Sequence, residues 1–223
     1  MKPVRSAIRL SSPSGEAGWT HLDASGQPTA WHIATDLSCQ GNSLWCGIYN
    51  PAWTGDPDQK GYDNGWIHEA SNFVDLTGAS SPVVLSFKHR LNVESGFDIA
   101  EVDVFHPDQG WLPLASFTGV VDPPGAALCD TFFTQIPDSF VAKTPILEFR
   151  LLFTSDASGS SSDGLYPDAA GWSLDNFTVR AGISDIRFFD DFESGMGTWS
   201  VSVFPAVRDL WRIVAHAAEL PEP

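Results

Sequence analysis

Short stretches in which apolar and polar residues alternate dominate this chain. Residues 83–88, 100–104 and 147–153 each place an apolar side chain at every second position, and helical periodicity is hard to find. A period of two is typical of a strand with one face in a core and the other in water. The pattern therefore predicts an all-β protein.

Turn-forming residues separate these stretches, notably at residues 75–82, 107–110 and 122–125. Many short strands without intervening helices predict an antiparallel β-sandwich of the jelly-roll kind. Residues 39–68 and 154–170 are long and irregular, and we expect them to form loops. Loops on a rigid sandwich are where binding sites usually lie.

A segment near the start of the chain is echoed near its end. Trp19 and Trp31 are 12 residues apart, as are Trp199 and Trp211, and a Ser-Gly pair precedes each first tryptophan by the same distance. The displacement is 180 residues (199 − 19). Repeats of this size are whole domains in tandem, which is typical of modular surface proteins.

The repeat predicts a jelly-roll domain over residues 1–182 and the opening of a second repeat, a C-terminal strand-like extension, over residues 183–223. The second part is too short to bury a core of its own. Its apolar strand must be disordered, fold back on the first domain, or be donated to a neighbouring copy. We expect ordered packing with Phe188, Phe192 and Trp199 buried.

The charge balance limits the classes of partner. The chain has 12 Lys and Arg against 28 Asp and Glu, a formal net charge of −16. Such a field repels nucleic acids and anionic membranes and attracts divalent cations, although solubility alone is another reason for it. No apolar run is long enough for membrane insertion. The first twelve residues lack a secretory signal, so either a signal was removed or the protein stays inside the cell.

Two of the three cysteines enclose a short polar loop. Cys39 and Cys46 are expected to form a disulfide, with Cys129 left as a free thiol. Three free structural thiols are the alternative. A disulfide and the abundance of Gly, Asn, Ser and Asp favour an extracellular or cell-surface location.

Aromatic residues are concentrated in the first irregular segment. Exposed aromatic rings offer rigid area for stacking on a sugar or on a partner protein. Alternatively, they attach the loop to the sandwich. The candidate ligand-binding residues are Trp45, Tyr49, Trp53, Tyr62 and Trp66.

Asp175 interrupts the alternation near the end of the first repeat. Trp172 and Leu174 share one parity, whereas Phe177 shares the other parity with Asp175. A carboxylate on an apolar face is costly unless it is paired or bound to a metal, and Ca²⁺ takes several oxygen ligands. A bulge that leaves Asp175 in water is the alternative. Further candidate ligands are Asp98 and Asp156.

Motifs for catalysis are sparse. The sequence contains no His-Glu-x-x-His, no zinc-binding cysteine spacing and no Gly-x-Ser-x-Gly. Glu101 and Asp103 share one strand face, where paired carboxylates for glycoside cleavage are one interpretation and a solvated edge is the more ordinary one.

Several spaced motifs resemble those of one family of extracellular domains. They lie at residues 72–76, 84–90, 93–94, 97–104, 111–114, 147–150, 153–156 and 171–179. In this order they are similar to the MAM-like jelly rolls of bacterial surface proteins, of the choice-of-anchor J or cleaved-adhesin type, which are also attached to immune-inhibitor-A metallopeptidases. The resemblance implies an extracellular jelly-roll domain of a bacterial surface protein.

The family's acidic opening also has a counterpart here. It corresponds to Asp191, Phe192 and Glu193, followed by Trp199. The resemblance implies that the opening carboxylates join Asp175 around a cation. The first copy departs from this pattern, because the positions that match Asp191 and Glu193 are Ser11 and Pro13.

Together these features predict a non-catalytic extracellular binding or adhesion module. We expect it to recognise a glycan or a cell-surface protein through its aromatic loops and to be stabilised by Ca²⁺. One alternative is a carbohydrate-active hydrolase or lyase on the same fold. Another is a self-assembling surface or filament subunit in which the C-terminal segment mediates self-association by completing a neighbour.

Overall fold

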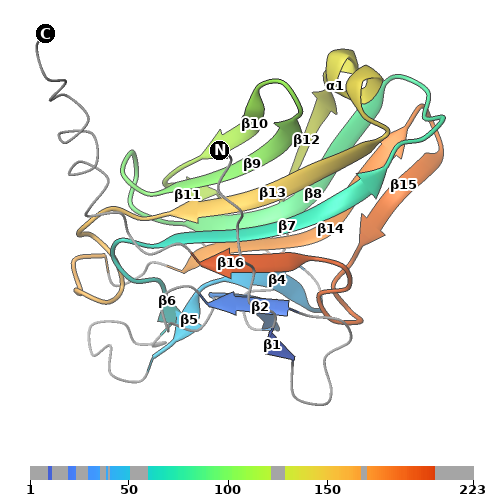
Figure 1. Ribbon diagram of the computed structural model, residues 1–223. Helices are drawn as coiled ribbons and strands as arrows, with labels where there is room; N and C mark the ends of the chain where they lie inside the picture. Colours follow the sequence, from blue (N-terminus) through green and yellow to red (C-terminus); the bar gives the residue numbers. More distant parts are fainter. Residues whose placement is uncertain are drawn as a thin grey trace, which may run out of the picture.

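The structure is a computed structural model. It describes residues 10–11, 20–23, 30–35, 39, 41–50, 60–121, 129–166 and 170–203. Two β-sheets pack face to face and enclose one core (Figure 1). The predicted all-β sandwich is therefore confirmed. No helix in the described part of the chain is long and apolar enough to cross a membrane.

The first sheet, called sheet A here, has seven strands. Its order is β1 (Leu10–Ser11), β2 (Thr20–Asp23), β16 (Ser200–Val203), β7 (Ile67–Asp75), β13 (Ile146–Thr154), β9 (Ile99–His106) and β10 (Gly110–Phe117). All of its neighbouring strands are antiparallel except β2 and β16, which run parallel.

The second sheet, called sheet B, faces sheet A across the core. Its central path is β11 (Val120–Val121), β8 (Val83–Asn92), β14 (Gly171–Ala181), β4 (Ser43–Cys46) and β3 (Trp31–Ala34). Two more strands join the same sheet: β12 (Asp130–Ile136) pairs with β8, and β15 (Asp185–Asp190) pairs with β14. A short hairpin of β5 (Ile48–Tyr49) and β6 (Lys60–Gly61) and the helix α1 (Asp138–Lys143) complete the described elements.

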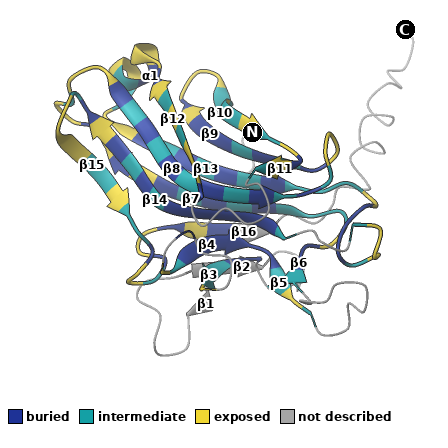
Figure 2. Ribbon diagram, turned by 180° about the vertical axis from the view of Figure 1, so that it is seen from behind, coloured by how far each residue is buried: buried dark blue, intermediate teal, exposed yellow. Residues whose placement is uncertain are grey.

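The alternation in the sequence becomes the two faces of each strand. Along β8 every second residue from Val83 to Leu91 is buried, and along β13 every second residue from Leu147 to Phe153 is buried (Figure 2). The inward side chains of the two sheets meet at Phe177 of β14. Its ring is stacked on that of Phe87 in sheet B, with 6.0 Å between the ring centroids, and its centroid lies 6.3 Å from that of Phe149 in sheet A.

The segment that follows β14 folds back on the preceding strands. Strand β15 continues from β14 as a hairpin, and β16 adds to sheet A beside β7 (Figure 1). Phe192 and Trp199 are buried, as expected, and Phe188 is half-buried. The indole ring of Trp199 lies edge-on to Phe177 at 4.9 Å, and its N–H donates to Asp190 at 3.1 Å.

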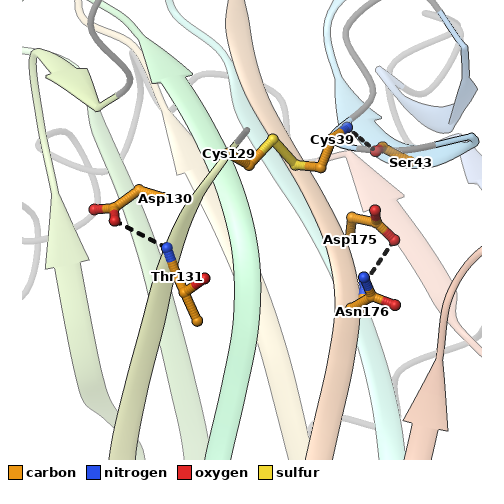
Figure 3. Close-up of a disulfide and its surroundings, with 7 residues drawn as sticks. All are labelled: Cys39, Ser43, Cys129, Asp130, Thr131, Asp175 and Asn176. Carbon is orange, nitrogen blue, oxygen red and sulfur yellow. Dashed lines mark hydrogen bonds between the residues drawn. A yellow bond between two sulfur atoms is a disulfide. The ribbon is translucent and has the colours of Figure 1, made fainter. Parts of the chain in front are cut away.

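The prediction that Cys39 and Cys46 form a disulfide and leave Cys129 free is wrong. Cys39 is bonded to Cys129, 90 residues away, with 5.1 Å between their Cα atoms (Figure 3). Cys46 is instead a buried free thiol in β4, paired in the sheet with Trp31 and with Trp172. Burial raises the pKa of this thiol well above its usual value. Nearness in sequence misled the prediction because β4 carries Cys46 into the core, away from Cys39.

The disulfide closes a long loop, so we expect it to contribute measurably to the free energy of unfolding. We expect Cys129→Ser to lower the free energy of unfolding by up to about 4–5 kcal/mol, the chain-entropy value for a loop of this length. Cys39→Ser should cost the same, and the double variant no more. Urea unfolding measures the loss. Thiol labelling of unreduced, denatured protein should modify Cys46 alone, and a labelled Cys129 would contradict the pairing.

Candidate functional site

A β-bulge in β14 explains why the alternation breaks at Asp175. The pairing of β14 with β8 shifts between Asp175, which lies opposite Lys88, and Thr178, which lies opposite Ser86. The extra residue is Asn176, whose φ of 53° is in the left-handed region that Asn tolerates better than most residues. The bulge returns Phe177 to the inner face and leaves Asp175 on the outer face of sheet B.

Asp175 is nevertheless buried, with an exposed fraction of 1 %. Its Oδ1 accepts a hydrogen bond from the backbone N–H of Asn176 at 2.7 Å (Figure 3). Its Oδ2 is buried and accepts none from any described residue. The alternative interpretation of the sequence expected a bulge that leaves Asp175 in water. The bulge is present, but the side chain does not lie in water.

The surroundings of Asp175 disfavour its charged form. Burial, together with the weaker effect of the charges of Glu193 and Asp191, raises the pKa of its carboxyl to about 6, although the Asn176 N–H and Lys88 act in the opposite direction. The structure thus brings the expected opening carboxylates near enough to Asp175 to act on it electrostatically.

Asp191 and Glu193 are held by the turn that follows β15. Glu193 accepts hydrogen bonds from Asn42, through the backbone N–H at 3.0 Å and the side-chain amide at 3.3 Å. The site also needs a glycine, because a Cβ at Gly41 would lie 1.8 Å from Glu193 Oε1. Within the described ranges, no three His, Cys, Asp or Glu side chains converge closely enough to hold a metal ion.

Asp98 and Asp156 belong to a different cluster. Asp98, fully buried at the start of β9, accepts hydrogen bonds from the Tyr62 hydroxyl and from the backbone N–H of Asp156, the latter at 2.9 Å. Burial and repulsion by Asp156, Asp98 and Asp163 raise the pKa of the neighbouring Glu94. Both oxygens of Asp98 are therefore already used to attach loop residues to the sandwich.

Most of the candidate aromatic residues do not form an exposed surface. Trp45 and Tyr62 are 4 % and 0 % exposed, and Trp66 is half-buried. The indole N–H of Trp45, in strand β4, donates to the Ala170 carbonyl at 2.8 Å, so this ring attaches the end of the second irregular segment to sheet B. Only Tyr49 among the described candidates is exposed, whereas Trp53 lies outside the described residues. Tyr62 is a core residue and Trp45 is buried in strand β4, so neither offers the exposed ring that the prediction required.

The outer face of sheet A carries an ion-pair network that the sequence analysis missed. The Nε and Nη2 atoms of Arg150 contact Asp103 Oδ2 at 2.7 Å each, and Nη1 contacts Glu69 at 3.2 Å. The guanidinium carbon lies 4.5 Å from the ring centroid of Trp111. Asp103 is only 2 % exposed, so it is not on a solvated edge. The sequence did contain a signal for this network: Arg150 is a cation on one alternating strand, and Asp103 is an anion on another.

On the outer face of sheet B, a row of four paired residues crosses four strands and has an exposed phenylalanine at each end. Phe133 of β12 lies opposite Ser86 of β8, which lies opposite Thr178 of β14, which lies opposite Phe189 of β15. The two phenylalanines are 74 % and 53 % exposed. We call these four residues the sheet B row. The two strands that carry these phenylalanines, β12 and β15, contain several exposed positions (Figure 2).

The sheet B row adjoins Asp175. One row further along the same strands, Thr131 pairs with Lys88 and Lys88 pairs with Asp175. On the other side of the row, Val84 pairs with Arg180 and Arg180 pairs with Ile186, which is 60 % exposed. The buried carboxylate and the exposed aromatic residues therefore belong to one continuous face.

Comparison with protein-family models and with curated proteins found no match for this chain. The MAM-like resemblance therefore stays an expectation, carried by the motifs alone.

The raised pKa of Asp175 predicts a pH-dependent stability. Because the folded protein binds this proton more tightly than the unfolded chain, stability should fall as pH rises from about 4 to about 6 and then stay low. Two pKa units correspond to at most about 3 kcal/mol. Without added divalent cations, Asp175→Asn should flatten this slope and be the more stable form at pH 7.

Asp130→Asn is the matched control. Asp130 also accepts a hydrogen bond from the next backbone N–H, at 2.9 Å, but it is exposed (Figure 3). Chemical unfolding from pH 3.5 to pH 8 compares the two variants with the unaltered protein. An equal slope in Asp175→Asn and Asp130→Asn would contradict the assignment to Asp175.

Proposed function

We propose that this protein is a non-catalytic extracellular module that binds a glycan on the outer face of sheet B and is stabilised by Ca²⁺ at Asp175. The observation that carries the proposal is the sheet B row, in which two exposed phenylalanines flank two hydroxyl side chains. Exposed apolar patches rimmed by polar groups are typical of binding surfaces.

The chemistry of this face suits a sugar. A pyranose ring presents C–H groups that pack on an aromatic side chain and hydroxyls that hydrogen-bond at its edges. Three strand spacings separate Phe133 from Phe189, about 14 Å, which is long enough for more than one ring. Ser86 and Thr178 lie between them, and Lys88 and Arg180 lie in the flanking rows.

The Ca²⁺ part of the proposal is supported by the electrostatics of Asp175. A buried carboxylate oxygen without a partner, beside Asp191 and Glu193, is stabilised when a cation replaces its lost hydration. Glu193 must then rotate from Asn42 toward Asp175. The disulfide supports the extracellular setting, since such bonds persist in oxidising compartments.

A second candidate function is supported by the outer face of sheet A. Burial, and then the charge of Asp103, raises the pKa of Glu101, while burial and the charge of Glu69 raise that of Glu148. Carboxyls with raised pKa values are what a glycoside hydrolase uses as its general acid. The hydrolase alternative therefore places its acids beside Arg150.

A glycan array tests the binding function. We expect the protein to bind a polysaccharide in Ca²⁺ and to bind it less tightly in chelator. Phe133→Ala with Phe189→Ala should weaken binding at least tenfold, about 1.4 kcal/mol. Phe73→Ala is the matched control, since this phenylalanine is 58 % exposed on sheet A. Equal loss in the control, or no glycan bound, would contradict the proposal; in the second case a protein partner takes its place.

The same samples separate the alternatives. Steady release of reducing ends that is lost in Glu101→Gln or Glu148→Gln would establish the hydrolase instead of the binding module. For the cation, Ca²⁺ should raise the melting temperature of the unaltered protein and of Asp130→Asn but not of Asp175→Asn. Equal Ca²⁺ effects on all three proteins would exclude Asp175 as a ligand.

A further inference from the structure

The two copies of the repeat lie side by side in sheet A. Strand β16 pairs in parallel with β2 at Val201 and His21, Ser202 and Leu22, and Val203 and Asp23. Each pair is 180 residues apart, which is the displacement between Trp19 and Trp199. Equivalent positions of the two copies are therefore direct neighbours in the sheet.

Of the two neighbouring strands, β16 is the one that pairs with the main body of sheet A. Strand β16 pairs with β7 at four positions, from Ser200 opposite Ser71 to Val203 opposite His68. Strand β2 lies one strand further out. We call the edge of β7, together with the core space beside Phe177, the β7 docking site.

The side chains explain which copy occupies the β7 docking site. The C-terminal copy buries four apolar residues that are at most 7 % exposed: Phe192, Met196, Trp199 and Val201. At the equivalent positions, 180 residues earlier, the first copy has Ser12, Glu16, Trp19 and His21. Three of its four anchors are polar, and burying unpaired polar groups in that space is unfavourable.

We propose that the β7 docking site accepts the opening segment of any intact repeat, and that a second copy of this chain can supply it with residues 185–203. Strand addition to β7 provides main-chain hydrogen bonds that do not depend on which chain the strand comes from. The turn between β14 and β15 is the hinge for such an exchange: Gly182 has a φ of 59° and Ile183 is 95 % exposed.

Moving the anchors from one copy to the other tests whether the copies compete. Phe192→Ser with Met196→Glu gives the C-terminal copy the residues of the first copy. This impaired variant should lose stability and the hydrogen-exchange protection of residues 200–203. Adding Ser12→Phe and Glu16→Met should restore stability and move the protection to residues 20–23. The control carries only Ser12→Phe and Glu16→Met; no restoration beyond its effect would overturn the competition.

A labelled peptide of residues 185–203 tests the exchange between chains. By fluorescence anisotropy, it should bind the impaired full-length variant saturably and raise its melting temperature. The same peptide with Phe192→Ser and Met196→Glu should bind at least tenfold more weakly, and neither peptide should bind the unaltered chain, whose site is filled. Equal binding of both peptides would overturn the proposal.

The milder variant Met196→Glu keeps the test decisive if the impaired variant does not fold. Met196 is 7 % exposed, so its replacement disturbs the rim of the site and leaves Phe192 and Trp199 in place. The peptide should displace its weakened C-terminal segment, with loss of protection at residues 200–203 of the chain. Absence of saturable binding to this variant would also overturn the proposal.

Discussion

The contact between Trp199 and Phe177 joins the parts of this structure. Phe177 lies between the sheets, stacked on Phe87 and close to Phe149, and the edge of the Trp199 ring closes the space beside it at 4.9 Å. Trp199 comes from the C-terminal part of the described chain, directly before β16, which pairs with β7 in sheet A. The C-terminal segment therefore completes the core that the preceding strands form.

The bulge at Asn176 links this core to the candidate site. Without the extra residue, Phe177 would point away from the core, and Trp199 would lose its partner. With it, Asp175 lies buried on the outer face, opposite Lys88 of β8 and within the electrostatic influence of Glu193. The free energy of packing Phe177 offsets the cost of a buried carboxylate, so the same local distortion stabilises the fold and creates a charged site.

The two outer faces of the sandwich differ in how their side chains are used. On sheet A, Arg150 engages Asp103, Glu69 and Trp111, so the polar groups mostly satisfy one another. On sheet B, Phe133 and Phe189 are exposed on either side of two hydroxyl side chains. An unsatisfied apolar surface next to an unpaired carboxylate is a better basis for binding than a closed ion-pair network.

The alternation of residues in β8, β9 and β13 was enough to predict an all-β sandwich, because side-chain direction in a strand is a local property with a period of two. The sequence also marked Asp175 as anomalous and showed that Phe192 and Trp199 needed a core. It could not identify Cys129 as the partner of Cys39, the burial of Trp45 and Tyr62, or the pairing of Arg150 with Asp103. Those outcomes depend on register and packing between segments far apart in the chain, and only the assembled sheets decide which of these side chains meet.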